Sequence, residues 1–217
     1  MPQRTINLTF HGIGMPLRPL EHGEADVWVS RERFESLLDA VAGRDDVRIT
    51  FDDGNASDLE LAVPALRRRG LTGAFFVVAG RLETPGFLHA AGVRELADAG
   101  MSIGCHGMRH RPWRRLDDAS LEEELVEARA RLERIAGAPV TEAACPFGSY
   151  DRRVLRALRR SGYRTVYTSD RGHAAAGSWI QPRNTVSARD GADLVGRITA
   201  TNGTLRRRAK LTAKRWR

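Results

Sequence analysis

The segment Arg48–Ala79, RITFDDGNASDLELAVPALRRRGLTGAFFVVA, contains one complete strand–helix–strand unit. Arg48–Phe51 and Thr72–Ala79 are short apolar runs with β-branched and aromatic residues, which is typical of buried strands. Between them Ser57–Arg69 is predicted to be a helix, with its first residue as a candidate cap and Gly70 as its end. Because a helical connection returns the chain to the same edge of a sheet, the two strands are expected to pair in parallel.

The same alternation continues in both directions along the chain. The further predicted strands are Thr5–Phe10, Met101–Cys105, Glu142–Pro146, Thr165–Ser169 and Trp179–Val186. The further predicted helices are Arg31–Val41, Val93–Ala99, Ser120–Ile135 and Asp151–Arg160, and the third opens with the capping-box residues Ser120 and Glu123. About seven short apolar strands separated by helices predict an α/β protein with a distorted, TIM-like (β/α) barrel of parallel strands.

Composition and charge narrow the possible functions. With 217 residues, 41% of them hydrophobic, the chain is long enough for one well-filled α/β domain. Of the net charge of +8, seven cations lie in the last residues, LRRRAKLTAKRWR, so only +1 belongs to the rest. A nearly neutral body has no basic stripe for a phosphate backbone, which argues against nucleic acid as a partner. We therefore predict a domain at residues 1–204 and a basic tail at residues 205–217.

The cellular location is predicted from what the sequence lacks. The N-terminus has no apolar run behind its single Arg, and no apolar stretch approaches the roughly 18 residues of a membrane span. Cys105 and Cys145 each lie beside a motif described below, which argues against a disulfide framework. The expected location is the cytoplasm. The tail, with its cations and Leu205, Leu211 and Trp216, is expected either to dock on an anionic membrane surface at the periphery or to remain solvated.

Two carboxylates and two histidines follow predicted strands. Asp52 and Asp53 leave a strand together, and neighbouring residues of an extended chain point in different directions, so one can bind a cation while the other faces a water. His106 and His110 are four residues apart, so a helical turn would bring both imidazoles to one side. Two imidazoles and one carboxylate leave a tetrahedral ion one open position, as catalytic zinc requires. The alternatives are an ordinary Asp-Asp-Gly turn and a surface histidine pair.

A third motif, Ala144–Asp151 (ACPFGSYD), follows another predicted strand. The backbone amides of Phe147 and Gly148 lie next to a helix start, where they could donate hydrogen bonds to an oxyanion. The alternative is a plain strand-to-helix turn in which Asp151 caps the helix.

These three motifs, in this order, resemble the polysaccharide deacetylase family, also called carbohydrate esterase family four or the NodB-type domain. The resemblance covers roughly Thr5–Val186. It implies a distorted (β/α) barrel and a divalent ion, usually Zn²⁺. It also implies that Asp53, His106 and His110 are the metal ligands and that Asp52 is the catalytic base.

The activity implied by the resemblance is metal-assisted hydrolysis of an N-acetyl group on a sugar, with release of acetate. The Phe147 amide would help to hold the oxyanion. The rest of the same motif provides candidates for substrate contacts at Pro146, Gly148 and Tyr150. The implied partner is an N-acetylated sugar or glycan.

The chain departs from the family pattern in three places. Gly107 stands where the His motif usually has Ser or Thr, and Ala144 stands where many members have an Arg that pairs with the catalytic Asp. Arg183, on the last predicted strand, is a candidate to reach the same carboxylate from the other side of the barrel. A late Leu-x-His motif, the usual source of the general acid, is missing, which leaves His11 and His173 as candidates, with water or Asp52 itself as the alternative proton donor. For Arg183 and both histidines the alternative is an uninvolved surface residue.

The expected location favours one class of substrate. A cytoplasmic enzyme meets nucleotide-linked or lipid-linked N-acetylated sugars before it meets a finished wall polymer, so a glycan precursor, as in exopolysaccharide biosynthesis, is favoured. One alternative is a deacylase of the same mechanism on another amide or ester, such as a formylated lipid-linked sugar or a small ureide. The other is a non-catalytic carbohydrate-binding derivative. The oligomeric state does not follow from the sequence.

Overall fold

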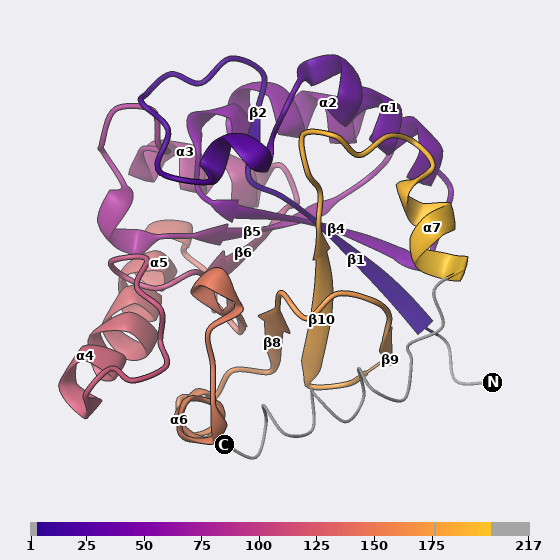
Figure 1. Cartoon of the computed structure of the whole chain (residues 1–217). Helices are drawn as coiled ribbons and strands as arrows, with labels where there is room; N and C mark the ends of the chain where they lie inside the picture. Colours follow the sequence, from indigo (N-terminus) through magenta and orange to yellow (C-terminus); the bar gives the residue numbers. More distant parts are fainter. Residues whose placement is uncertain (1–3, 176, 201–217) are drawn as a thin grey trace.

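A computed structural model describes residues 4–175 and 177–200 and shows a closed barrel of seven parallel strands (Figure 1). The strands are β1 (Arg4–Phe10), β4 (Val47–Asp53), β5 (Gly73–Val77), β6 (Ser102–Cys105), β7 (Glu142–Ala144), β8 (Thr165–Thr168) and β10 (Ile180–Thr185). They follow one another around the ring in chain order, and β10 closes the ring by pairing in parallel with β1. The predicted distorted (β/α) barrel is confirmed.

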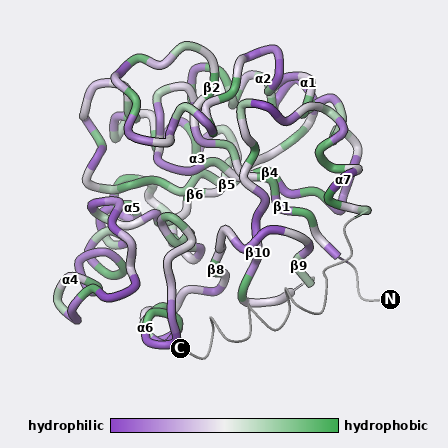
Figure 2. Tube along the Cα trace, in the orientation of Figure 1, coloured by the Kyte–Doolittle hydropathy of each residue, from purple (hydrophilic) through white to green (hydrophobic). Residues whose placement is uncertain are grey.

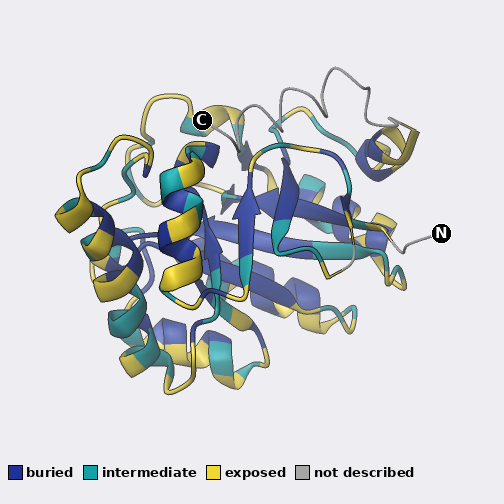
Figure 3. Cartoon of the chain, turned by 90° about the horizontal axis from the view of Figure 1, so that it is seen from below, coloured by how far each residue is buried: buried dark blue, intermediate teal, exposed yellow. Residues whose placement is uncertain are grey.

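Helices connect the strands and cover the outside of the barrel, with their exposed faces turned outward (Figure 3). Hydrophilic and hydrophobic residues alternate along them (Figure 2), as expected for helices that pack on one side. They are α1 (Arg31–Val41), α2 (Val63–Arg67) with a preceding π-turn η2 (Asp58–Ala62), α3 (Ala90–Asp98), α4 (Asp118–Glu122), α5 (Ala128–Ala136) with the π-turn η4 (Glu123–Glu127) before it, α6 (Arg152–Arg160) and α7 (Leu194–Ala200). Every predicted helix is present, whereas α7 was not predicted.

Alternate residues of each strand face the helices and the barrel interior. On β4, Phe51 faces outward, and its ring stacks on that of Phe75 with centroids 4.4 Å apart. Thr50 and Asp52, to either side of Phe51, both contact the buried Arg183 inside the barrel. The alternation expected for a strand therefore separates an apolar outer layer from a polar interior near the carboxyl end.

Helix caps differ from the prediction at two of three positions. Ser57 already has helical backbone angles, and its hydroxyl accepts a hydrogen bond from the Ile13 amide instead of capping the helix. Asp117, one turn before the predicted start, caps α4 by accepting a 2.7 Å hydrogen bond from the Ser120 amide, so the Ser120 capping box is wrong. Asp151 does cap α6.

The loop between β2 (Gly12–Ile13) and β3 (Trp28–Val29) lies at the carboxyl end of the barrel and contains the 3₁₀ turn η1 (Glu24–Asp26). These two-residue strands pair in parallel and were not predicted. A Cβ atom on Gly12 would lie 2.2 Å from the Trp28 ring, so only glycine allows this close approach. The loop is thereby fixed at both ends, beside the mouth of the barrel.

None of the helices in residues 4–175 and 177–200 is long and apolar enough to cross a membrane. The basic tail at residues 205–217 and the predicted domain boundary at residue 204 lie outside the described residues. The division into domain and tail, and the membrane contact, therefore stay predictions.

Candidate active site

The candidate site is a cavity of about 370 Å³ at the carboxyl end of the barrel. Parallel strands all end at this rim, so residues that are far apart in the chain meet there. The predicted residues that line the cavity follow or end β1, β4, β6 and β7, and they are His11, Asp52, Asp53, His106, His110 and Phe147.

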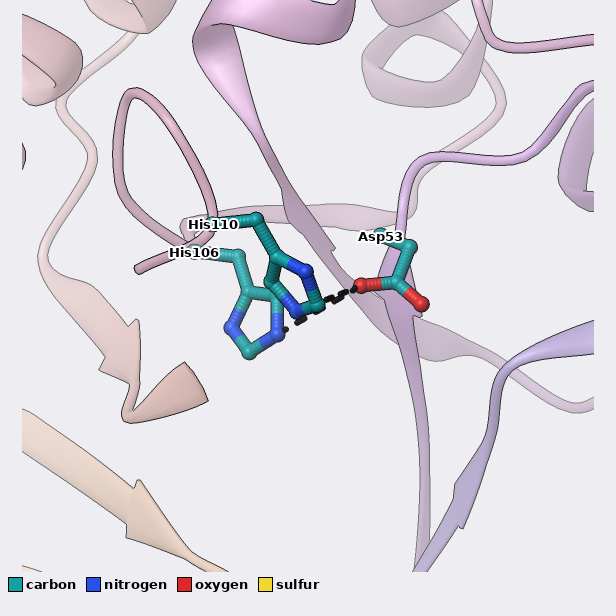
Figure 4. Close-up of side chains that lie close together, drawn as sticks. All are labelled: Asp53, His106 and His110. Atoms are coloured by element: carbon teal, nitrogen blue, oxygen red, sulfur yellow. Dashed lines mark ion pairs between the residues drawn. The ribbon is translucent and has the colours of Figure 1, made fainter. Parts of the chain in front are cut away.

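Asp53, His106 and His110 are grouped so that they could hold a metal ion (Figure 4). Their ligand atoms lie within 4.8 Å of one another. Oδ1 of Asp53 is 3.1 Å from Nε2 of His110 and 3.7 Å from Nε2 of His106. This buried oxygen accepts no hydrogen bond from the residues that the structure describes. One carboxylate oxygen and two imidazole nitrogens that converge in this way fit a divalent ion such as Zn²⁺.

Both imidazoles are suited to act as metal ligands. Nδ1 of His106 lies 2.9 Å from the carbonyl oxygen of Ala144, which accepts a hydrogen bond from Nδ1–H and leaves Nε2 unprotonated toward Asp53. Burial lowers the pKa of His110 to about 4. His110 is therefore neutral near pH 7, which is the form that binds metals.

Three residues of the site have a left-handed backbone, which is uncommon outside glycine. The φ angles are 76° at Asp53, 53° at His110 and 55° at Phe147. Such positions cost about 1–3 kcal/mol each and tend to occur at functional sites. At the end of β4, the turn at Asp53 directs its carboxylate toward the histidines, whereas the preceding Asp52 carboxylate faces the barrel interior.

Asp52 is held by Arg183 of β10. Two guanidinium nitrogens donate to the two carboxylate oxygens, each at 2.6 Å, and both side chains are almost completely buried. The guanidinium carbon also lies 5.2 Å and 5.7 Å from the ring centres of Phe76 and Tyr167. Burial by itself would raise the pKa of Asp52, but the charge of Arg183 and its hydrogen bonds hold that pKa well below its usual range. The predicted contact between Arg183 and Asp52 is present, and Asp52 is ionised.

The two histidines considered as proton donors lie at opposite ends of the barrel. His11 lines the cavity, and its buried Nδ1 has no hydrogen-bond partner among the described residues. His173 directly precedes β9 (Ala174–Ala175), in which Ala174 pairs with Thr5 near the start of β1. The expectation for His173 is wrong, because the chain after β8 returns to the amino end of the barrel.

Phe147 brings the third motif to the site. Phe147 is 65% exposed, and the centre of its ring lies 4.5 Å from that of His110. The neighbouring amide of Gly148 donates a 2.9 Å hydrogen bond to the Cys145 carbonyl, so it is already used. Of the two amides considered for an oxyanion, the one at Phe147 stays a candidate.

The other residues of this motif have structural positions. Pro146 and Gly148 are buried and do not line the cavity, and a Cβ atom on Gly148 would lie 2.9 Å from Ser169. Tyr150 is 1% exposed, and its hydroxyl donates a 2.6 Å hydrogen bond to Asp170. Substrate contact at Pro146, Gly148 and Tyr150 is therefore not supported, because the segment is a tightly packed strand-to-helix turn.

Several residues of the cavity wall were not predicted. Ser169 and Thr185 end or follow strands β8 and β10, so the position of their strands was the signal for them. The remaining wall comes from the loop between β2 and β3, which has no motif or periodicity, and its lining residues are Glu21, His22, Gly23, Glu24 and Val27.

A parallel barrel that brings two histidines and a carboxylate together at its carboxyl rim, beside a buried carboxylate held by a guanidinium, has the arrangement of a TIM-like enzyme barrel. The family model described as "Polysaccharide deacetylase" matches residues 40–166, which is more than half of the chain. The chain belongs to the polysaccharide deacetylase family, and the resemblance noted in the sequence is confirmed.

Individual relatives agree with this family. The Bacillus subtilis (strain 168) protein named "Putative polysaccharide deacetylase YxkH" is 26% identical over 129 residues, or 59% of this chain. The match spans just under half, 46%, of that relative's length. The deacetylase PplD of Streptococcus pyogenes, solved in complex with acetate, superposes with a TM-score of 0.81 at 18% identity over 93% of this chain and 100% of its own. IcaB from Ammonifex degensii gives 0.73 at 21% identity over 92% and 98%. These similarities show a shared fold.

Proposed function

We propose that the protein is a metal-dependent hydrolase that removes an N-acetyl group from a sugar of a polysaccharide or lipid-linked glycan precursor and releases acetate. The observation that carries the proposal is the convergence of Oδ1 of Asp53 with Nε2 of His106 and His110, beside an ionised Asp52. Membership of the polysaccharide deacetylase family supports it.

Asp53, His106 and His110 would hold the ion, for which we propose Zn²⁺. When bound, a divalent ion supplies Lewis acidity to the acetyl carbonyl and lowers the pKa of water. Both imidazoles are in the form that binds metals before any ion is present, because the Ala144 carbonyl fixes the tautomer of His106 and burial keeps His110 neutral.

Asp52 accepts the proton of the attacking water. Arg183 holds both carboxylate oxygens, so the base has one orientation. Since its pKa is well below the usual range, Asp52 is a weak base and can act only on a water whose own pKa is lowered. Base and ion are therefore needed together, and neither suffices alone.

His11 is the proposed acid that protonates the leaving amine. The barrel closes through β1 and β10, so the end of β1 lies beside the end of the last strand. A histidine that follows β1 can thus occupy the part of the cavity where the family's late Leu-x-His histidine would be expected. The Phe147 amide is the proposed donor to the oxyanion, and its exposed ring provides an apolar wall for the sugar.

We further propose that the enzyme works in the cytoplasm on a lipid-linked precursor and that the seven cations of residues 205–217 hold it at an anionic membrane. Sedimentation with anionic liposomes tests this, with the chain lacking residues 205–217 as the comparison. Loss of binding on deletion supports the membrane contact, and unchanged binding removes it.

Metal analysis combined with acetate release from a panel of N-acetylated sugars tests the hydrolase proposal. Asp53→Ala and His106→Ala should lose the bound ion together with activity. Asp52→Asn should keep the ion and lose activity, because only the base is changed. A panel that includes a formylated sugar and a ureide distinguishes the alternative deacylases, which would release formate, or cleave the acyl–nitrogen bond of the ureide to give a carboxylate, instead of acetate. Purified native protein that binds no divalent ion would refute the proposal.

A further inference from the structure

A fully buried acid, Glu124, lies on the apolar side of the long helical segment that follows the His106–His110 loop. It belongs to η4, the π-turn between α4 and α5, and its exposed fraction is 0%. Leu121 and Leu125 on the same segment are buried core residues. A carboxylate in such surroundings costs free energy unless hydrogen-bond donors surround it, so its donors indicate what it does.

The donors come from the loop that carries the two histidines. Oε2 of Glu124 accepts a 3.0 Å hydrogen bond from the backbone amide of Met108. Oε1 accepts one of 3.0 Å from the amide of Arg109. The indole N–H of the buried Trp113 donates to Oε2 at 3.3 Å. The two amides lie between the histidines in the sequence, so one carboxylate fixes the backbone of the segment that joins them.

Gly107 leaves the space that the carboxylate occupies. A Cβ atom at this position would lie 2.1 Å from Oε2 of Glu124, and the φ angle is 89°, which favours glycine. Its amide also donates to the sulfur of Cys105 at 3.4 Å. Glycine at position 107 and the acid at position 124 therefore form one arrangement.

The neighbouring Glu123 makes a useful contrast. Its carboxylate binds the side chains of Arg109 and Arg111, at 2.7 and 2.8 Å, and it is partly exposed. Within residues 4–175 and 177–200, its carboxylate accepts no hydrogen bond from a backbone group of the loop. Both acids pair with the Arg111 side chain, which lies 3.5 Å from Oε1 of Glu124. Glu124 alone of the two also holds the backbone amides between the histidines.

We infer that Glu124 is a positioning residue for the proposed metal site: it fixes the loop so that both imidazoles face Asp53, without itself touching the ion. The inference rests on the proposed function, because it assigns a purpose to the order of that loop. It predicts that Glu124 controls the affinity of the site for zinc and the protection of the loop amides from hydrogen exchange.

The test variant is Glu124→Gln, which has the same shape but turns one acceptor into a donor that faces N–H groups. Zinc affinity, measured by competition with a chromophoric chelator, should fall about 10- to 100-fold, as for other groups that orient metal ligands. In the metal-free protein, hydrogen exchange at the Met108 and Arg109 amides should accelerate. Glu123→Gln is the matched control and should change neither quantity by more than about twofold.

The variant Leu132→Ala distinguishes positioning of the loop from a general effect on stability. It truncates a buried side chain of the same helical segment at a place away from the loop. If zinc affinity only follows global stability, Leu132→Ala should lower it as much as Glu124→Gln does, and the inference is overturned. Unchanged zinc affinity in folded Glu124→Gln also overturns it. If that variant does not fold, Glu124→Asp takes its place under the same criteria.

The exchange measurement separates this inference from the proposed function. If native protein binds no zinc, the proposed function fails, and faster exchange in Glu124→Gln but not in Glu123→Gln still supports the control of the loop by Glu124. If native protein binds zinc and exchange in Glu124→Gln equals that of Glu123→Gln, the positioning role fails alone.

Discussion

Replacing Arg183 by Lys changes the partner of the proposed base while keeping its charge. The guanidinium donates to both oxygens of Asp52 at 2.6 Å and lies near the rings of Phe76 and Tyr167. An ammonium group is a point charge without the planar fork, so it cannot reproduce the two parallel hydrogen bonds. We expect Asp52 to lose its fixed orientation and to be less strongly stabilised as a carboxylate.

The size of the effect follows from one lost charge-assisted hydrogen bond, worth about 1.5–3 kcal/mol. If that stabilisation is lost from the transition state, kcat/KM falls roughly 10- to 150-fold, since about 1.4 kcal/mol is a factor of ten. The pKa of Asp52, now held below its usual range, should rise. The acid limb of the pH profile should therefore move to higher pH.

The assay is acetate release as a function of pH, with the metal content of each sample measured in parallel. Metal content should not change, because Arg183 binds Asp52 and not the proposed ligand Asp53. Arg48→Lys is the matched control: Arg48 also binds a carboxylate, Glu142, at 2.9 Å, but near the amino end of the same barrel. Near-normal activity in Arg183→Lys with an unmoved acid limb would refute the role of Arg183.

Three further predictions concern single residues. His11→Gln should slow hydrolysis of an N-acetyl amide about 10²- to 10⁴-fold but affect an activated aryl acetate little, because that leaving group needs no proton; equal losses on both substrates would remove His11 as the acid. The lowered pKa of His110, about 4 when folded, means that metal-free protein loses stability as pH falls from about 6.5 to about 4, so His110→Asn should flatten thermal unfolding midpoints over that range. Burial, and then the charges of the two site aspartates, raise the pKa of Asp58, whose oxygens have no hydrogen-bond partner among the described residues. The contribution of Asp58 to folding stability is therefore present at low pH and lost as pH rises above about 4. Asp58→Asn should stabilise metal-free protein at neutral pH in denaturant titrations, and a destabilised variant would contradict this.

Strand positions and the ends of strands could be predicted because they depend on local pattern. The alternation at Thr50, Phe51 and Asp52 identifies both the outer face of β4 and the carboxylate at its end. The partner of that carboxylate could be predicted only by assuming that the last strand closes the barrel, and Arg183 on that strand does bind Asp52. Local pattern did not place His173, because the direction of the chain after β8 is set by pairing of β9 with the start of β1.

Glu124 illustrates a different limit of the sequence. As one of several acids in Ser120–Ile135, it reads as part of a solvated helix face. Its spacing from Leu121 is three residues, which places it on the buried side, and this was the available signal. Its partners are backbone amides of the loop at residues 106–110, and backbone groups leave no pattern in a sequence.

Closure of the ring by β1 and β10 has a consequence for how relatives of this protein are compared. Strands β10, β1 and β4 are consecutive around the ring. His11, Asp52 and Arg183 therefore come from three neighbouring strands, although these residues are far apart in the sequence. The family match ends at residue 166, before β10, and thus leaves Arg183 outside it. In a closed ring, a required group can be supplied from a different strand without disturbing the others. Active-site residues of distantly related barrels should therefore be compared by their position around the barrel axis and their height along it. Their order along the chain is less informative.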